Sequence, residues 1–297
     1  MSAPRPFWPG TTYHVTRRCT QGEFLLRPST LTNALFLYVL AEAARRTGVL
    51  IHAFCVMSNH VHLVLTDLHG RLPEFEHFLD TLTARALNVA LGRSQSFWDG
   101  DGYVAVALAT PEAVVDSVAY VLANPVAAAL VANGRDWPGL WSNPELIGGA
   151  ALVAERPNVF FRKDGPMPAS ASLQLVPPPG FSAEEFRNAV LAKLAGREES
   201  ARAEVRASGR AFLGPRRVLE LETTTRAARP GGRGKLRPTV ATRDPARLRE
   251  ELDRRADFRA RYRAAREAFV RGIRDVVFPA GTYWFRVACG AACEPAG

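Results

Sequence analysis

The sequence is poor in lysine and cysteine and has no long hydrophobic run. Only three of its 38 basic residues are lysines. Its four cysteines are scattered and do not form the dense framework that stabilises small secreted domains. No segment reaches the roughly 18 apolar residues of a membrane span, and the N-terminus lacks the apolar core of a signal peptide. We therefore expect a cytoplasmic protein with no membrane partner.

Arginine supplies nearly all of the positive charge. The net charge is +9 and the pI is about 9.9. The planar guanidinium suits phosphate and stacked bases, so nucleic acid is the leading class of partner. A GC-rich genome also enriches arginine, and composition does not separate these two explanations. Hydrophobic residues make up 47% of the 297 residues, which is enough for a folded core.

Two histidines separated by one apolar residue lie in a β-rich segment. His60 and His62 flank Val61 in the run from Phe54 to Thr66. Side chains two residues apart on a strand leave the same face, about 6.5 Å apart at the backbone. Both imidazoles could therefore bind one divalent metal ion. The alternative is two polar residues on the solvent-exposed face of a strand.

The hydrophobic pattern predicts an α+β fold in the first half of the chain. Alternating residues indicate strands, and apolar residues at helical spacing indicate helices. The predicted strands span 13–17, 49–57, 60–66 and 103–108, and the helices 31–47 and 73–91. Thr110-Pro-Glu112 then supplies a cap, a proline and an acid for a third helix to about Ala123. This order matches a ferredoxin-like sandwich, an antiparallel sheet with helices packed on one face.

The composition changes after about residue 147, which predicts three regions. Residues 1–147 form the predicted sandwich domain. Residues 148–181 are rich in proline and predict a linker with little regular structure. Residues 182–297 predict a basic, largely helical C-terminal extension, in which Ser182 and Glu185 have capping-box spacing. Its arginine-rich helix either forms ion pairs within a solvated helix or contacts nucleic acid, and both readings stay open.

The predicted third helix carries three polar residues at intervals of four. Asp116, Tyr120 and Asn124 therefore project from nearly one face of the helix. The opposite face is apolar and is expected to pack on the sheet. A tyrosine next to a carboxamide is unusual on a plain amphipathic helix. The alternative is a boundary tyrosine with its hydroxyl in water, and an asparagine that ends the helix before Pro125.

Together these groups favour phosphoryl transfer. Two imidazoles and an amide oxygen leave open positions on Mg²⁺ or Mn²⁺, and such an ion polarises a phosphodiester. A tyrosine hydroxyl, with an ordinary pKa near 10, is a poor nucleophile in water. Held near a metal-bound phosphate, it can attack phosphorus and form a phosphotyrosine. The combination indicates strand transfer on DNA.

Four motifs occur in order along roughly residues 5–145: Tyr13-His-Val-Thr-Arg-Arg18, Val56-Met-Ser-Asn-His-Val-His-Leu-Val-Leu65, Ser96-Phe-Trp98, and Tyr120-Val-Leu-Ala-Asn-Pro-Val126 followed by Leu130-Val131. Together they resemble the REP-associated tyrosine transposases of the HUH single-strand DNA transposase superfamily. The resemblance implies that residues 1–147 are a catalytic domain. It implies metal ligation by His60 and His62, nucleophilic attack by Tyr120, and a third metal ligand at Asn124.

The resemblance also implies a partner and further contacts. Such enzymes bind hairpin-forming single-stranded DNA, cut it to leave a 5′-phosphotyrosine and rejoin strands. We therefore expect a nucleoid-associated monomer or homodimer. Arg17, Arg18 and Trp98 are candidate DNA contacts, although Trp98 equally fits a core position. His14 is expected to be structural rather than a ligand. The family often has an arginine and a glycine where this chain has Ala127–Ala129, which weakens one expected DNA contact.

Two other functions remain from the sequence. A nickase of the relaxase or replication-initiator kind would use the same groups. The short chain and the lack of a helicase-like glycine-rich phosphate loop argue against it. The second alternative is a domesticated protein that binds hairpin DNA without cutting it. Such a protein has no chemical need for two histidines, a tyrosine and an asparagine together.

Overall fold

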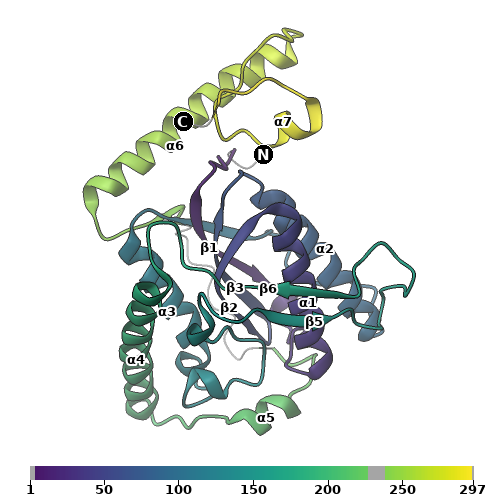
Figure 1. Ribbon diagram of the computed structural model, residues 1–297, viewed down its shortest axis with the longest axis vertical. Helices are drawn as coiled ribbons and strands as arrows, with labels where there is room; N and C mark the ends of the chain where they lie inside the picture. The colour runs from purple at the N-terminus through teal and green to yellow at the C-terminus, as the bar shows by residue number, and fades with distance from the viewer. Residues whose placement is uncertain (1–3, 227–237, 296–297) are drawn as a thin grey trace.

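A computed structural model of the protein describes residues 4–226 and 238–295. At its centre is a five-stranded sheet in the order β2-β3-β1-β4-β7 (Figure 1). β1 pairs antiparallel with β3 and β4, β2 pairs antiparallel with β3, and β7 runs parallel to β4. The strands are β1 (Thr11–Arg18), β2 (Val49–Met57), β3 (His60–Asp67), β4 (Val104–Leu108) and β7 (Val240–Ala241).

Helices lie on both faces of this sheet. α1 (Thr30–Thr47) and α2 (Leu72–Ala90) cover the face that carries Val61. α3 (Pro111–Ala127) lies on the opposite face, where it meets His62. The ferredoxin-like α+β fold predicted from the element order is confirmed, and α3 adds a layer on the second face.

The predicted start of one helix is confirmed, and the predicted end of another is wrong. Ser182 and Glu185 form a complete capping box at the start of α4 (Ala183–Ala207). α3, however, continues through Pro125 to Ala127, so the predicted end near Ala123 is wrong. Pro125 lacks a backbone N–H and so removes one hydrogen bond of the helix. It is tolerated because the helix ends only two residues later, at Ala127. The last turn is closed by the Ala128 amide, which donates to the Asn124 carbonyl at 2.9 Å.

The proline-rich region 148–181 contains more regular structure than its composition predicts. β5 (Leu152–Glu155) and β6 (Ser170–Leu173) form an antiparallel hairpin that packs against α1. The Tyr38 hydroxyl of α1 donates to the Pro168 carbonyl at 2.6 Å. The expectation of little regular structure is wrong here because alternate strand residues, such as Leu173, enter the main core. The division into three regions stays a prediction.

The C-terminal region is largely helical, as predicted. It contains α4, α5 (Pro215–Glu220), α6 (Pro245–Val270) and α7 (Trp284–Cys289). Phe278 and Phe285 stack at 4.6 Å in a second, smaller hydrophobic cluster. Trp8 connects this cluster to the sheet, because its indole nitrogen donates to the Ala280 carbonyl at 3.0 Å.

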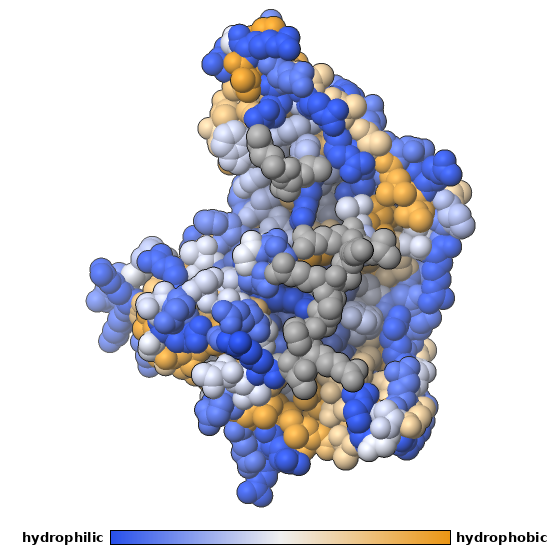
Figure 2. Space-filling view, turned by 180° about the vertical axis from the view of Figure 1, so that it is seen from behind, coloured by the Kyte–Doolittle hydropathy of each residue, from blue (hydrophilic) through white to orange (hydrophobic). Residues whose placement is uncertain are grey.

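One face of the protein is mainly hydrophilic. Figure 2 shows hydrophilic residues over much of one face, with smaller hydrophobic areas between them. α6 forms ion pairs within itself, such as Arg247 with Glu250 at 2.6 Å. In the described ranges, no helix combines the length and the apolar character needed to cross a membrane.

His52 joins β2 to the segment that follows β6. It lies at a register shift in β2 and is fully buried. Its Nδ1 is 2.7 Å from the Val176 carbonyl, and its Nε2 is 2.7 Å from the Thr66 hydroxyl. Because a carbonyl only accepts, the proton is on Nδ1. Burial lowers the pKa of His52 to about 4.

We predict that His52 makes the free energy of unfolding depend on pH. Its folded pKa lies below the ordinary value of 6.5, so the unfolded chain binds more protons between pH 6.5 and 4. The stabilisation is complete above pH 6.5 and is lost as the pH falls towards 4, by up to about 3 kcal/mol. Urea unfolding at pH 7 and pH 4.5 measures this difference.

His52→Gln should reduce the difference in unfolding free energy between the two pH values. His77→Gln, at an exposed position of α2, controls for the loss of a histidine elsewhere. Equal pH dependence in the wild type and in His52→Gln would contradict the assignment.

Candidate active site

β1 and β3 place three imidazoles on one face of the sheet. Residues paired across antiparallel strands share a face, and Thr16 pairs with His62 while Arg18 pairs with His60. The ring centroids of His60 and His62 are 4.8 Å apart. The ring of His14 lies 5.1 Å from that of His62. The two histidines predicted from alternation therefore lie side by side, and β1 adds a third.

Asn59 sets the protonation of the His60 ring. The Asn59 amide nitrogen donates to the Gly22 carbonyl at 3.2 Å, which orients the amide oxygen towards His60. His60 Nδ1 is 2.7 Å from that oxygen and donates to it, because the oxygen can only accept. In the neutral ring the proton is then on Nδ1, and Nε2 carries a free lone pair. This is the arrangement in which an outer hydrogen bond orients a metal-binding histidine.

His62 is oriented by β1. Its Nδ1 is 2.9 Å from His14 Nε2 and 3.1 Å from the Thr16 hydroxyl. Its other nitrogen, Nε2, takes no part in these two contacts. His14 thus contacts His62 through Nε2, and its structural role stays a prediction.

All three imidazoles are neutral at pH 7. Burial, with repulsion from Arg18, lowers the pKa of His60 to about 4. Burial and the neighbouring charges of His60, His14 and Arg18 hold the pKa of His62 well below its usual range. Burial alone lowers the pKa of His14 to about 4. Neutral imidazole is the form that binds a metal ion.

α3 brings Tyr120 to the same place. Its ring centroid is 5.8 Å from those of both His14 and His62, and the residue is 45% exposed. All of these residues belong to one chain, so no second copy is needed to bring them together. Asn124 lies one turn further along α3 and is half-buried. Asp116, one turn earlier, forms ion pairs with Lys193 at 2.8 Å and Arg243 at 2.9 Å.

The imidazole pair has the donor chemistry of a divalent metal site. His60 and His62 each have one ring nitrogen in a hydrogen bond and the other outside it. Within residues 4–226 and 238–295, no three His, Cys, Asp or Glu side chains are grouped so that they could hold an ion. Metal binding by the pair, and the Asn124 amide as a third ligand, stay predictions.

The three candidate DNA contacts lie in different environments. Arg17 faces α2, where its Nε is 2.8 Å from the Asp80 carboxylate. Trp98 is 7% exposed, and its indole nitrogen donates to the Asp80 carbonyl. Arg17 and Trp98 thus pack on the face of the sheet opposite the histidines, and the burial of Trp98 fits the alternative in which it is a core residue. Arg18 is exposed beside His60 and stays a candidate DNA contact.

The structure is similar to two solved structures of other proteins. A REP-associated tyrosine transposase bound to a REP hairpin is 20% identical, with a TM-score of 0.40 over 47% of this chain and 81% of that chain. A candidate transposase from Deinococcus radiodurans R1 is 22% identical, with a TM-score of 0.28 over 36% of this chain and 85% of that chain. No family model and no curated protein matches. Both likenesses are too low to decide the function.

We predict that Mn²⁺ binds at the imidazole pair. His60→Ala and His62→Ala each remove a ligand and should abolish measurable binding, whereas Asn59→Ala should raise the Kd by about 10-fold because it frees the His60 ring. Isothermal titration of the full chain at pH 7 measures the Kd. His77→Ala, at an exposed position, is the control. Unchanged affinity in both single variants of the pair would place the ion elsewhere.

Proposed function

We propose that the protein is a metal-dependent single-strand DNA transposase. It would cleave and rejoin hairpin-associated single-stranded DNA through a 5′-phosphotyrosine intermediate. The observation that carries this proposal is the packing of the exposed Tyr120 ring against His62, whose partner His60 has a ring nitrogen available for a metal ion. A nucleophile and a metal-binding pair are the two parts that this chemistry needs.

Each residue has a defined part in the proposed reaction. His60 and His62 would hold Mg²⁺ or Mn²⁺, with Asn124 as the third ligand. The bound ion would polarise the phosphodiester and neutralise charge that develops on its oxygens. Asn59 and His14 keep the imidazoles oriented, so that less reorganisation accompanies binding.

The bonding changes balance without a further reactant. The Tyr120 oxygen attacks phosphorus and loses its proton, and the bond from phosphorus to the 3′ oxygen of the preceding nucleotide breaks. That oxygen takes up a proton, and the upstream fragment leaves with a 3′-hydroxyl, while the downstream fragment stays on Tyr120 through its 5′ phosphate, as a phosphodiester. In the reverse step, a 3′-hydroxyl from another strand attacks the phosphotyrosine and releases the tyrosine hydroxyl.

Two features favour this function over a protein that only binds hairpins. A binding protein gains nothing from an exposed tyrosine beside buried, neutral imidazoles, because burying them costs desolvation energy. Such perturbed groups around a reactive side chain are typical of catalytic sites. A relaxase-like nickase shares this chemistry and differs in the fate of the strand, so a strand-rejoining assay separates it.

We predict that Tyr120→Phe abolishes covalent attachment to DNA, because it removes the attacking oxygen. Purified protein is incubated with Mn²⁺ and a labelled pool of single-stranded oligonucleotides that contain hairpins. A denaturing gel then detects the protein–DNA adduct. Tyr262→Phe, a matched change within the C-terminal cluster, should leave the adduct intact.

The outcomes separate the alternatives. An adduct with Tyr120→Phe would show that the nucleophile is wrong. Hairpin binding without any adduct in the wild type would favour the non-catalytic protein. Adduct formation without transfer to an added 3′-hydroxyl strand would favour the nickase.

A further inference from the structure

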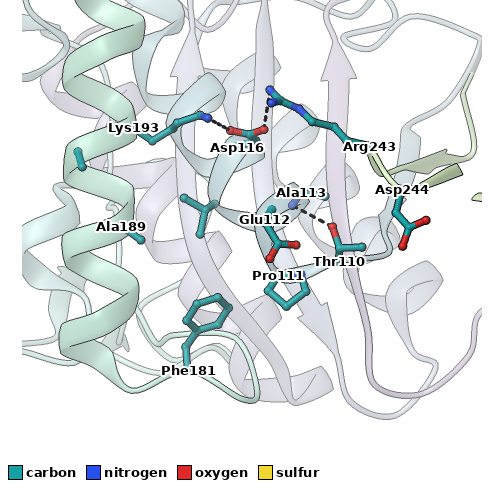
Figure 3. A pocket seen from close by; sticks show the side chains of 12 residues that line it. Thr110, Pro111, Glu112, Ala113, Asp116, Phe181, Ala189, Lys193, Arg243 and Asp244 are labelled. Atoms are coloured by element: carbon teal, nitrogen blue, oxygen red, sulfur yellow. Dashed lines mark hydrogen bonds and ion pairs between the residues drawn. The ribbon is translucent and has the colours of Figure 1, made fainter. Parts of the chain in front are cut away.

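α4 runs parallel to α3 and borders the exposed side of Tyr120. Lys193 Nζ lies 2.8 Å from Asp116 Oδ1, and the Arg197 guanidinium lies 5.9 Å from the Tyr120 ring centroid. From Lys193 to Arg197, α4 advances by about one turn, and α3 advances by the same amount from Asp116 to Tyr120. The two helices therefore run in the same direction. Figure 3 shows Lys193 of α4 meeting Asp116 of α3 above the hollow between them. Arg197 is thereby set beside the candidate nucleophile.

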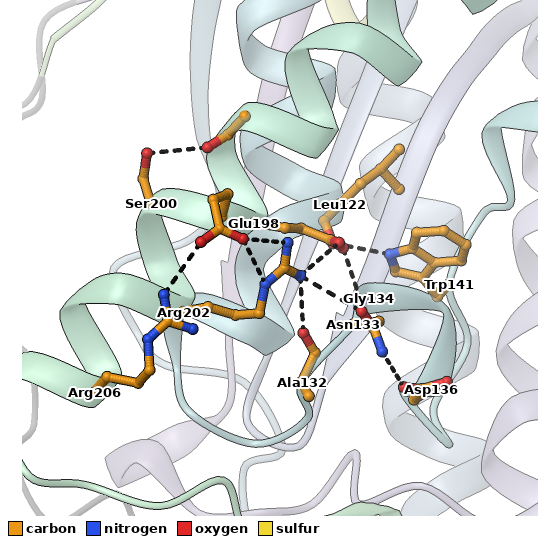
Figure 4. A network of polar contacts seen from close by, with 12 residues as sticks. Leu122, Ala132, Asn133, Gly134, Asp136, Trp141, Glu198, Ser200, Arg202 and Arg206 are labelled. Atoms are coloured by element: carbon orange, nitrogen blue, oxygen red, sulfur yellow. Dashed lines mark hydrogen bonds and ion pairs between the residues drawn. The ribbon is translucent and has the colours of Figure 1, made fainter.

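Beyond Arg197, α4 contacts the segment that follows α3 in the chain. The Gly134 amide donates to Glu198 Oε1 at 2.7 Å, and Arg202 donates to the Ala132 carbonyl at 3.2 Å (Figure 4). A Cβ at position 134 would lie 2.8 Å from the Glu198 carboxylate, so glycine allows this approach. These contacts fix α4 on both sides of Arg197.

A groove lies between α3 and α4 at this position. Its volume is about 600 Å³, and it adjoins a second hollow of about 900 Å³ with which it shares Lys193 and Arg243. Small residues from both helices line much of the groove: Ala123, Ala127, Ala192, Gly196 and Ala201. Small side chains allow the backbone of an extended ligand to approach closely. Tyr120 also lines the groove, so a ligand bound there would contact the candidate nucleophile.

Three cations and one carboxylate line the groove: Lys193, Arg197, Arg243 and Glu204. Lys193 and Arg243 are both paired with Asp116. Arg197 forms no ion pair with any residue that the structure describes. Its Nε is buried and has no hydrogen-bond partner there. Arg197 lines the groove, so the remaining N–H groups of its guanidinium can donate to an anion bound there.

We propose that Arg197 binds a backbone phosphate of single-stranded DNA in this groove, next to Tyr120. This inference rests on the proposed function and names a further substrate contact for it. The planar guanidinium can donate two parallel hydrogen bonds to one phosphate. The DNA site then includes a residue of the C-terminal extension, which the family resemblance does not cover.

The test measures how salt weakens binding of the full chain to fluorescein-labelled dT20 in EDTA. Each phosphate contact contributes about −0.7 to the slope of log K against log salt for single strands. Arg197→Ala should make the slope shallower by about 0.7 and raise the Kd about 10-fold at low salt. Arg197→Lys keeps the charge and should keep the slope. Arg197→Gln keeps the stem beside Tyr120 and should behave like Arg197→Ala.

Arg206→Ala is the matched control, because Arg206 is nine residues further along α4 and faces the opposite side of that helix. It should leave both the slope and the Kd unchanged. Circular dichroism melting identifies the folded variants, and the slope is compared among those. A folded Arg197→Gln or Arg197→Ala with the wild-type slope would overturn the proposal.

This experiment is independent of cleavage, because EDTA removes the metal ion and dT20 forms no hairpin. A changed slope together with no covalent adduct in the earlier assay would support the groove and reject strand transfer. An adduct together with an unchanged slope would support strand transfer and reject the role of Arg197.

Discussion

The antiparallel pairing of β1 with β3 is the constraint on which the site depends. Its register sets Thr16 opposite His62 and Arg18 opposite His60. Opposed residues share a face, so this single alignment gathers the imidazoles and the groups that orient them. A slip of one residue would turn the β1 side chains to the other face. The polar side chains of β1 would then face α1 and α2, in the hydrophobic core that contains Val61.

Burial and hydrogen bonding together give the site its chemical character. Removing the imidazoles from water disfavours their charged forms, which keeps their ring nitrogens available for a metal ion. Hydrogen bonds from Asn59 and β1 then orient the neutral rings. Tyr120 has the opposite environment, with nearly half of its surface exposed. Neutral imidazoles and an exposed tyrosine thus lie side by side.

The local parts of the fold could be predicted because their signals lie within a few residues. Alternation predicted β3, and the spacing of Ser182 and Glu185 predicted the start of α4. The hairpin of β5 and β6 was missed, since short strands between prolines depend on the surface they pack against. The ion pair of Arg17 with Asp80 could not be predicted, because the two residues are far apart in the sequence.

The sequence by itself determined which candidate groups share a face, because strand and helix periods dictate where neighbouring side chains project. His60 with His62, and Tyr120 with Asn124, follow from those two periods. Only the tertiary structure decided that Tyr120 meets His62, and that Asn59 and His14 orient the imidazoles. It also brought Arg197 to Tyr120, although 76 residues separate them in the chain. Contacts between distant segments arise from packing of whole elements, and no short run of residues encodes them.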